Sequence, residues 1–105
     1  MTIRWGVSPI AWANDDMPEL GGDITLDALL TDVKEIGFEG VELGNKFPRD
    51  PEALKPIMAR YGLDIVGGWY SSNLLVQDAE AEIAAMGAHM ALWQAMGSCA
   101  FVLAE

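Results

Sequence analysis

The sequence has one cysteine, one histidine and no long apolar run. A single cysteine, Cys99, excludes an internal disulfide and fits a reducing compartment, so we expect a cytoplasmic protein in which Cys99 opens a buried strand. No stretch of about 18 apolar residues is present, so no membrane span is predicted. The opening MTIRWGVSP lacks the charged, apolar and small-residue order of a secretory signal.

Positive charge is scarce in this chain. Sixteen Asp and Glu residues against six Lys and Arg residues give a formal net charge of −10. A surface of that sign repels phosphate backbones and anionic lipid, so we expect neither a nucleic-acid nor a membrane partner. The acids are scattered and form no block, which indicates solvated faces rather than an acidic tail.

The common motifs for nucleotide and zinc binding are also absent. The sequence contains no GxGxxG, GxxxxGK[ST], CxxC or HExxH pattern. The only histidine, His89, is expected on a helix away from the strand ends, where packing is a more frequent role than ligation. No histidine–carboxylate metal cluster can be assembled from these residues.

What the chain does contain is a regular alternation of strands and helices. Apolar residues recur at steps of three and four from Leu26 to Ile36, after the N-cap residue Thr25 and before Gly37. Pro56 predicts that the second helix kinks or begins at that residue. The expected strands are Ile3–Val7, Phe38–Leu43, Leu63–Gly68 and Cys99–Ala104, and the expected helices are 26–36, 50–61 and 77–96.

This β-α-β-α-β-α-β order predicts an α/β fold with parallel strands and right-handed crossovers. We interpret residues 1–105 as a single partial domain, the N-terminal half of a (β/α)8 TIM barrel with its first four strands and three helices. The repeat of roughly 30 residues also suits an open doubly wound sheet. Periodicity alone does not choose between the two.

Polar and aromatic residues gather where the expected strands end, as in the stretch VELGNKFPRD. Amides and hydroxyls beside aromatic rings suit a polyol, because they bind its hydroxyls while the rings cover its C–H face. The alternative is ordinary loop polarity. If the strand tips share one mouth, the pocket would gather Asn45, Trp69 and Glu105. The candidate substrate-binding residues are Trp12, Asn14, Asn45, Lys46, Trp69, Tyr70, Asn73 and Glu105, with Ser71 and Ser72 beside them.

Lys46 is the cation among these candidates and the candidate catalytic residue. An ammonium group beside a bound carbonyl or enolate would stabilise developing charge or act as an acid. A salt bridge to a neighbouring acid is an equal alternative. Arg49 and Asp50 are expected to belong to the turn into the next helix.

Three segments carry a specific likeness: IRWGVSPIAWANDDMPELGG, GVELGNKFP and GGWYSSNLL, in that order. Together they resemble the N-terminal part of the myo-inosose-2 dehydratase family, whose members are xylose-isomerase-like (β/α)8 barrels. The resemblance implies a lyase of inositol catabolism that removes water from 2-keto-myo-inositol, with a divalent metal, Mn or Co. Such barrels need about 250 residues, and their metal ligands come from later strands.

We therefore expect this chain alone to bind no metal and to be inactive. The resemblance implies only that five residues form part of the wall of the substrate site: Asn14, Asn45, Lys46, Trp69 and Asn73. One alternative is a sugar isomerase or epimerase of the same superfamily. Another is a non-catalytic half-barrel that self-associates through its open sheet edges. Two copies would close an eight-stranded barrel-like dimer, or the sheet would instead rearrange into an open flavodoxin-like form.

Overall fold

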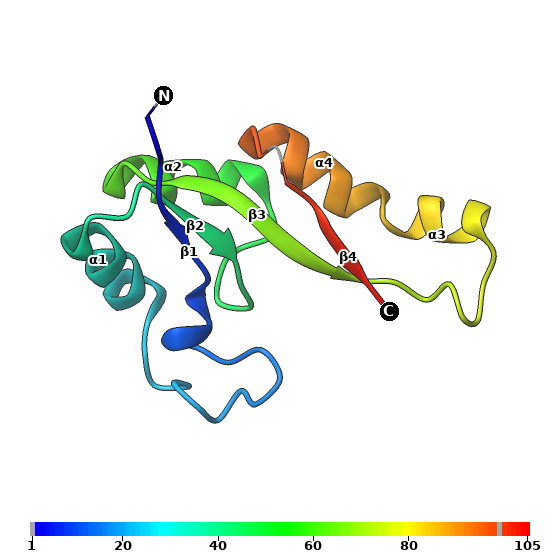
Figure 1. Ribbon diagram of the computed structural model, residues 1–105, viewed down its shortest axis with the longest axis horizontal. Helices are drawn as coiled ribbons and strands as arrows, with labels where there is room; N and C mark the ends of the chain where they lie inside the picture. The colour runs from blue at the N-terminus through cyan, green and yellow to red at the C-terminus, as the bar shows by residue number, and fades with distance from the viewer. Residues whose placement is uncertain (1, 99) are drawn as a thin grey trace.

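A computed structural model describes residues 2–98 and 100–105 of the chain, and in this part strands alternate with helices (Figure 1). The four strands are β1 (Gly6–Val7), β2 (Gly40–Leu43), β3 (Asp64–Ser71) and β4 (Val102–Ala104). The helices are α1 (Leu26–Ile36), α2 (Pro51–Tyr61), α3 (Ala79–Ala85) and α4 (Gly87–Met96), with a short 3-10 helix, η1 (Pro9–Ala11), after β1.

The strands form one parallel sheet in the order β1-β2-β3-β4. This confirms the predicted α/β fold. It also favours the barrel over the doubly wound alternative, because a doubly wound sheet reverses its strand order at a switch point and this sheet does not. Each strand lies beside the next one in the sequence, as in a (β/α)8 barrel.

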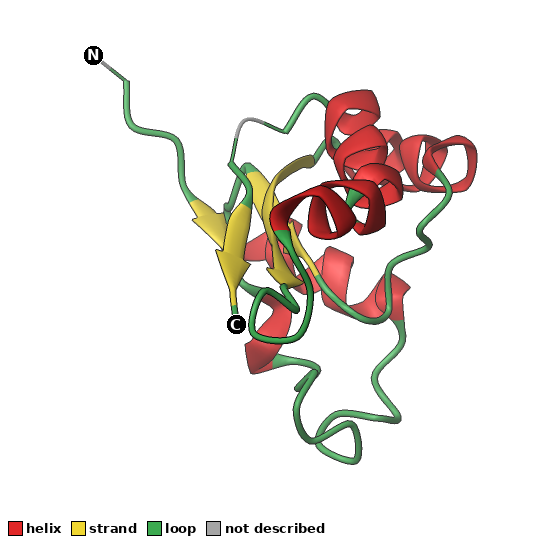
Figure 2. Cartoon of the chain, turned by 90° about the vertical axis from the view of Figure 1, so that its right-hand side faces the viewer, coloured by secondary structure: helices red, strands yellow, loops and turns green. Residues whose placement is uncertain are grey.

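The helices pack on one face of the sheet and leave the other face bare. Val41, Leu43 and Ile65 point to the helical side and are buried, whereas Val66 and Trp69 point to the other side and are exposed. In Figure 2 the strands lie to one side of the main helical layer. The core between the layers comes from three helices and the sheet, and its buried members include Leu29, Leu30, Val33, Leu54, Met58, Leu92 and Trp93.

The ends of α1 and α2 follow the sequence signals. The Thr25 hydroxyl accepts a hydrogen bond from the Ala28 N–H, and Gly37 ends α1 with φ 106°. Asp50 caps α2, which begins at Pro51 and continues through Pro56. The expectation that α2 begins at Pro56 is therefore wrong. Pro56 and Glu52 are both exposed, so the carbonyl that the proline leaves without a helical donor faces solvent.

Two strands differ in length from the sequence expectation. β1 covers two residues rather than the five from Ile3 to Val7, because it is an edge strand that pairs with β2 alone. β3 extends to Ser71, because its last three residues pair with β4. Trp69 and Tyr70 are thus strand residues that face opposite sides, not loop residues. The role expected for Cys99 lies outside the described residues.

The long helix expected over Gln77–Met96 is two helices in the structure. Asp78 caps α3, which ends at Ala85 with Met86 (φ −81°, ψ −2°) as its C-cap residue, and α4 begins at Gly87. Apolar residues at helical spacing, Ile83 among them, predict a buried stripe on this helix, but Ile83 is 66% exposed, while Glu82 beside it is only 2% exposed. Without an apolar stripe facing the core, little packing opposes a break at a residue of low helix propensity such as Gly87.

Close packing of α4 on β3 depends on Gly68. A Cβ built at Gly68 would lie 2.1 Å from a carbon of the Trp93 indole, so only glycine leaves room for that ring. The indole N–H of Trp93 donates to the Ala100 carbonyl at 2.6 Å and ties the helix to the segment before β4. The ring therefore fills the space that a side chain would take.

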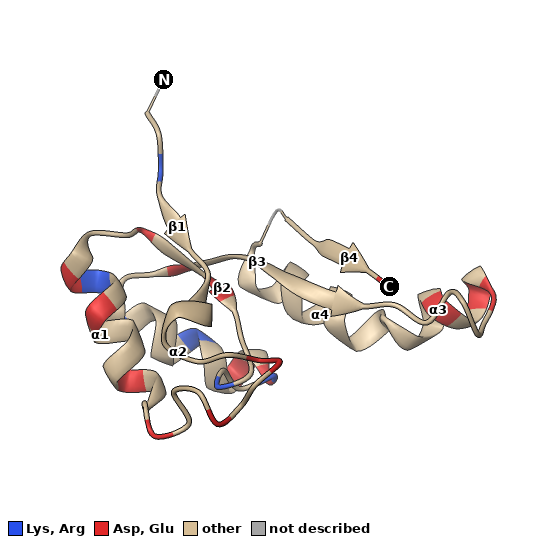
Figure 3. Ribbon diagram, turned by 60° about the horizontal axis from the view of Figure 1, so that its bottom comes forward, with Lys and Arg blue, Asp and Glu red and all other residues tan. Residues whose placement is uncertain are grey.

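The charged residues are unevenly distributed. Figure 3 shows acidic residues on α1, on the connection from β1 to α1 and on α3, while α4 carries none. Across the described residues, no helix combines the length and the apolar character needed to cross a membrane.

Candidate functional site

A pocket of about 400 Å³ lies at the carboxyl ends of β1, β2 and β3. In parallel βα folds this end of the sheet is where ligands bind, because the loops that follow the strands surround it. The lining comes from the residues after β1, from β2, from the β2–α2 connection and from β3. It consists of Ser8, Pro9, Ile10, Asp15, Asp16, Glu42, Leu43, Arg49, Trp69 and Ser71.

A β-bulge aligns the side chains of β2 and β3 at this pocket. Val41 pairs with Ile65 but Glu42 pairs with Gly67, so Val66 is an extra residue in β3. Since side chains alternate along a strand, Trp69 then shares the bare face with Glu42. Its indole N–H donates to the Ser71 hydroxyl at 3.0 Å, which orients the ring. The pocket thus has an aromatic surface beside a carboxylate.

Arg49 is the cation of the pocket. One of its terminal nitrogens donates to the Gly44 carbonyl at 3.1 Å. Partial burial lowers the pKa of Arg49, and the nearby Asp15 carboxylate opposes that change. Because a guanidinium keeps its proton in proteins, the group stays cationic and loses part of its water shell. A partly desolvated donor of this kind binds an oxygen acceptor more strongly than one in bulk water.

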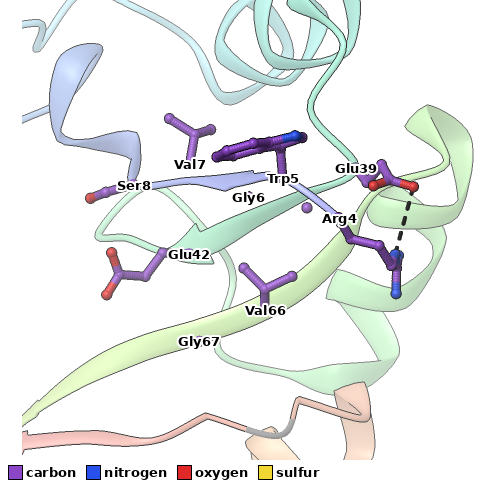
Figure 4. A pocket seen from close by; sticks show the side chains of 10 residues that line it. Arg4, Trp5, Gly6, Val7, Ser8, Glu39, Glu42, Val66 and Gly67 are labelled. Atoms are coloured by element: carbon purple, nitrogen blue, oxygen red, sulfur yellow. Dashed lines mark ion pairs between the residues drawn. The ribbon is translucent and has the colours of Figure 1, made fainter. Parts of the chain in front are cut away.

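A second hollow, about 440 Å³, lies on the bare sheet face toward the amino ends of the strands. Figure 4 shows the ion pair between Arg4 and Glu39 at one end of it and the side chains of Ser8 and Glu42 at the other. Arg4 also pairs with Asp64 at 2.6 Å, and all three side chains of this cluster are exposed. The hollow is part of the face that the helices leave uncovered.

The two candidate residues nearest the N-terminus shape the β1–α1 connection. The indole N–H of Trp12 donates to the Asp32 carboxylate of α1 at 2.9 Å, and the ring packs against the core. The Asn14 side-chain oxygen accepts from the N–H groups of Asp16 and Met17, both at 2.9 Å. Neither lines the pocket, although the turn made by Asn14 carries Asp16 into its wall.

Asn45 and Lys46 hold the same connection from the other side. The Lys46 ammonium donates to the carbonyls of Gly21 at 2.9 Å, Gly22 at 3.3 Å and Ile24. The backbone N–H of Asn45 donates to the Asp15 carboxylate at 3.3 Å. Among the described residues Lys46 makes no ion pair, so backbone carbonyls take the place of the alternative salt bridge.

Tyr70 and Asn73 contact a buried carboxylate on α3. The Tyr70 hydroxyl donates to Glu82 at 2.7 Å, the Asn73 N–H at 2.9 Å and the Gln77 amide at 2.6 Å. These three bonds, led by that of Gln77, lower the pKa of Glu82 although burial opposes them. The carboxylate is ionised at neutral pH and fixes the β3–α3 connection from the helical side.

Glu105 fixes that connection from the end of β4. Its carboxylate accepts from the Ser72 hydroxyl and from the N–H groups of Leu74 and Leu75. The bond from Ser72 is the largest of the effects that lower the pKa of Glu105. The pocket lining, drawn from the described part of the chain, includes Trp69 but neither Asn45 nor Glu105. The structure does not gather these three residues in one mouth.

His89 packs among aromatic rings. Its ring centroid lies 5.1 Å from those of Trp93 and Tyr70 and 6.4 Å from that of Phe101. Desolvation, followed by the positive charge of Arg49, lowers the pKa of His89, and a hydrogen bond with the Trp69 backbone opposes both. The expected packing role is confirmed, but the ring lies beside Tyr70 near the carboxyl end of β3 and not away from the strand ends.

Sequence reasoning missed Glu42 and Arg49 as members of the pocket. Glu42 lies between the apolar residues Val41 and Leu43, and period-two alternation places it on the face opposite the core. That signal was present in the sequence. Arg49 was expected only in the turn into α2, and no spacing rule shows that this turn brings its side chain back to the ends of the strands.

The described residues do not form a resident metal site. No three His, Cys, Asp or Glu side chains among them converge in a way that would hold a metal ion. Asp15, Asp16 and Glu42 line one pocket without forming such a cluster. The described residues therefore do not fit a divalent metal.

Removal of the Lys46 ammonium should loosen the β1–α1 connection. We expect Lys46→Met to lower the free energy of unfolding by about 1–3 kcal/mol, since hydrogen bonds to charged groups contribute on that scale. Amide hydrogen exchange over residues 14–24 should accelerate. Lys55→Met is the matched control, because Lys55 is exposed on α2 and has no hydrogen bond or ion pair among the described residues. If both substitutions changed the free energy of unfolding and the exchange rates equally, the proposed role of Lys46 in holding the β1–α1 connection would be contradicted.

Comparison with known proteins identifies relatives along the whole chain. No family model matches. The chain is 40% identical over 105 residues to the rhizopine catabolism protein MocC of Rhizobium meliloti, covering all of this chain and 32% of that protein. It is 40% identical over 105 residues to an inosose dehydratase of Lacticaseibacillus casei (35% of that protein) and 39% identical over 103 residues to one of Mesomycoplasma hyopneumoniae (34%).

A solved structure shares the fold. The probable 3-DHS dehydratase AsbF from Bacillus anthracis, a TIM-barrel-type protein, matches 96% of this chain and 38% of its own with a TM-score of 0.63 and 15% sequence identity. At that identity the match bears on the fold alone. The chain spans about a third of the length of the curated relatives. From end to end it is similar to the inosose dehydratases, as the three sequence segments indicated.

Proposed function

We propose that this chain supplies the first four strands of a (β/α)8 hydro-lyase that removes water from 2-keto-myo-inositol. The observation that carries the proposal is the identity of about 40% to inosose dehydratases over the whole chain. The relatives are about three times as long, so the activity belongs to a complete barrel and residues 1–105 are part of its single domain. The bare sheet face supports this, because the interior of a barrel is the face that its helices do not cover.

The chain contributes one wall of the substrate site in this proposal. Trp69 offers a flat surface to the C–H face of the ring, and the hydroxyls of Ser8 and Ser71 meet ring hydroxyls. The other candidate residues act through the loops that they hold in place. These are Trp12, Asn14, Asn45, Lys46, Tyr70, Asn73 and Glu105. A direct catalytic role for Lys46 would require its release from three carbonyls.

In this proposal the complete enzyme binds a divalent metal, Mn or Co, through residues of the later strands of the barrel. It also places the protein in the cytoplasm, with a cyclic keto-polyol as its substrate and without nucleic-acid or membrane partners. The net negative charge supports the absence of nucleic-acid and membrane partners, because it repels phosphate backbones and anionic lipid.

The test is a dehydration assay on the complete product of the reading frame. With 2-keto-myo-inositol and Mn²⁺ or Co²⁺, we expect the absorbance of the trihydroxycyclohexanedione to rise, and chelation by EDTA to stop it. Sugar isomerase and epimerase substrates serve as the comparison. Isomerised sugar without any dione, with either metal present, would replace the proposal with the isomerase alternative.

We also infer that the 105-residue chain, when isolated, self-associates through its bare face and sheet edges. The supporting observation is the exposure of large apolar residues there: Trp69 (57%), Val102 (41%) and Val66 (36%). Light scattering over a range of concentrations should give a mass above that of one chain. A single-chain mass at the highest concentration would contradict the inference.

A further inference from the structure

We propose that Glu42 and Arg49 form an acceptor–donor pair that selects a neutral keto-polyol over a ring carboxylate. The inference rests on the proposed function and names the residues that set its substrate class. Both side chains line the pocket at the carboxyl ends of the strands.

The sheet holds the backbone of Glu42, and its carboxylate has free acceptor capacity. Glu42 lies in the middle of the β2 ladder, between the paired residues Val41 and Leu43, and is half-buried. Figure 4 shows its carboxylate pointing away from the Arg4–Glu39 pair, toward the end of the sheet where Ser8 lies. The described residues give this carboxylate neither a hydrogen-bond donor nor an ion-pair partner. A partly desolvated carboxylate without donors favours a ligand that brings hydroxyl groups.

Arg49 is oriented by one bond and retains free donors. Its contact with the Gly44 carbonyl uses one of five N–H groups, and the guanidinium plane fixes the direction of the others. Arg49 is exposed in this chain, although desolvation of its guanidinium lowers its pKa. A ketone or hydroxyl oxygen of a bound ring restores hydrogen bonds to such a cation without adding a second charge.

The wall of the pocket that this chain supplies carries an excess of negative charge, which bears on the kind of ring it favours. Its lining holds three carboxylates, those of Asp15, Asp16 and Glu42, against the single guanidinium of Arg49. This excess repels a ring that carries its own carboxylate, while a neutral ring is unaffected. Trp69 adds the apolar surface that a flat ring of hydroxyl-bearing carbons needs.

The experiment uses the complete enzyme with three substitutions: Glu42→Gln, Arg49→Gln and the control Glu35→Gln, an exposed residue of α1. We expect Glu42→Gln and Arg49→Gln each to raise KM for 2-keto-myo-inositol about tenfold or more, with a smaller change in kcat. Glu42→Gln should also weaken discrimination against a ring carboxylate such as shikimate, measured by its inhibition constant. Glu35→Gln should match the wild type in all three quantities. Thermal melting of each variant shows whether it folds.

The outcomes separate the two proposals. Suppose that the wild type dehydrates the substrate and that the folded Glu42 and Arg49 variants have the same KM, kcat and inhibition constant as Glu35→Gln. This result would overturn the role of Glu42 and Arg49 in selecting the substrate and leave the proposed function standing. Absence of dione from the wild type would overturn the proposed function. In that case calorimetric binding of myo-inositol and shikimate to the same variants still tests the pair. Equal affinities for the wild type and both variants would overturn it.

Discussion

Parallel pairing of consecutive strands, with helices on one face only, is the constraint on which the rest of this structure depends. It lets β2 and β3 bury Val41, Leu43 and Ile65 among the helices and leaves the side chains of the opposite face uncovered. The two faces therefore have different chemistry. The covered face holds aliphatic side chains and the Trp93 indole, and the bare face presents Glu42, Val66 and Trp69 beside glycines. The same alternation places a carboxylate and an aromatic ring at the mouth of the pocket.

Charged side chains stabilise the connections at the carboxyl ends of the strands. Lys46 satisfies backbone carbonyls of the β1–α1 connection, and Glu105 satisfies N–H groups of the β3–α3 connection. Backbone N–H and carbonyl groups in irregular segments lack the partners that helices and sheets provide, and one charged side chain can hydrogen-bond to several of them. Glu82 supplies a third anchor through Tyr70, Gln77 and Asn73. A strongly acidic chain thus uses part of its charge to order the loops that surround a candidate site.

The sequence was sufficient for the elements with strong local signals and for the strand order. α1 has a cap, an apolar period and a terminating glycine, and its bounds agree with the expectation. The length of β3 was missed because it depends on pairing with β4, far along the chain. The break at Gly87 was missed because apolar residues at helical spacing suggested a buried stripe. In the structure Ile83 faces solvent, and Glu82 is the buried residue instead.

Polarity at the strand ends identified the region of the candidate site and two of its lining residues, Trp69 and Ser71, but not the others. Polar side chains there either face the pocket or satisfy nearby backbone groups, and a sequence does not separate the two uses. Lys46 and Glu105 hydrogen-bond to nearby backbone groups. Glu42 was overlooked inside a strand, where its alternation with Val41 and Leu43 was the available signal. Arg49 depends on the path of the β2–α2 connection, which no spacing rule supplies.

The strand order is tested most directly by cross-strand nuclear Overhauser effects in the isotopically labelled chain. We expect backbone contacts between Val41 and Ile65, and contacts from the Val66 methyl groups to the α-protons of Gly6 and Gly40. A flavodoxin-like rearrangement would place β1 between β2 and β3. Contacts between β1 and β3 backbones in place of those between Val41 and Ile65 would contradict the half-barrel and the pocket built on it.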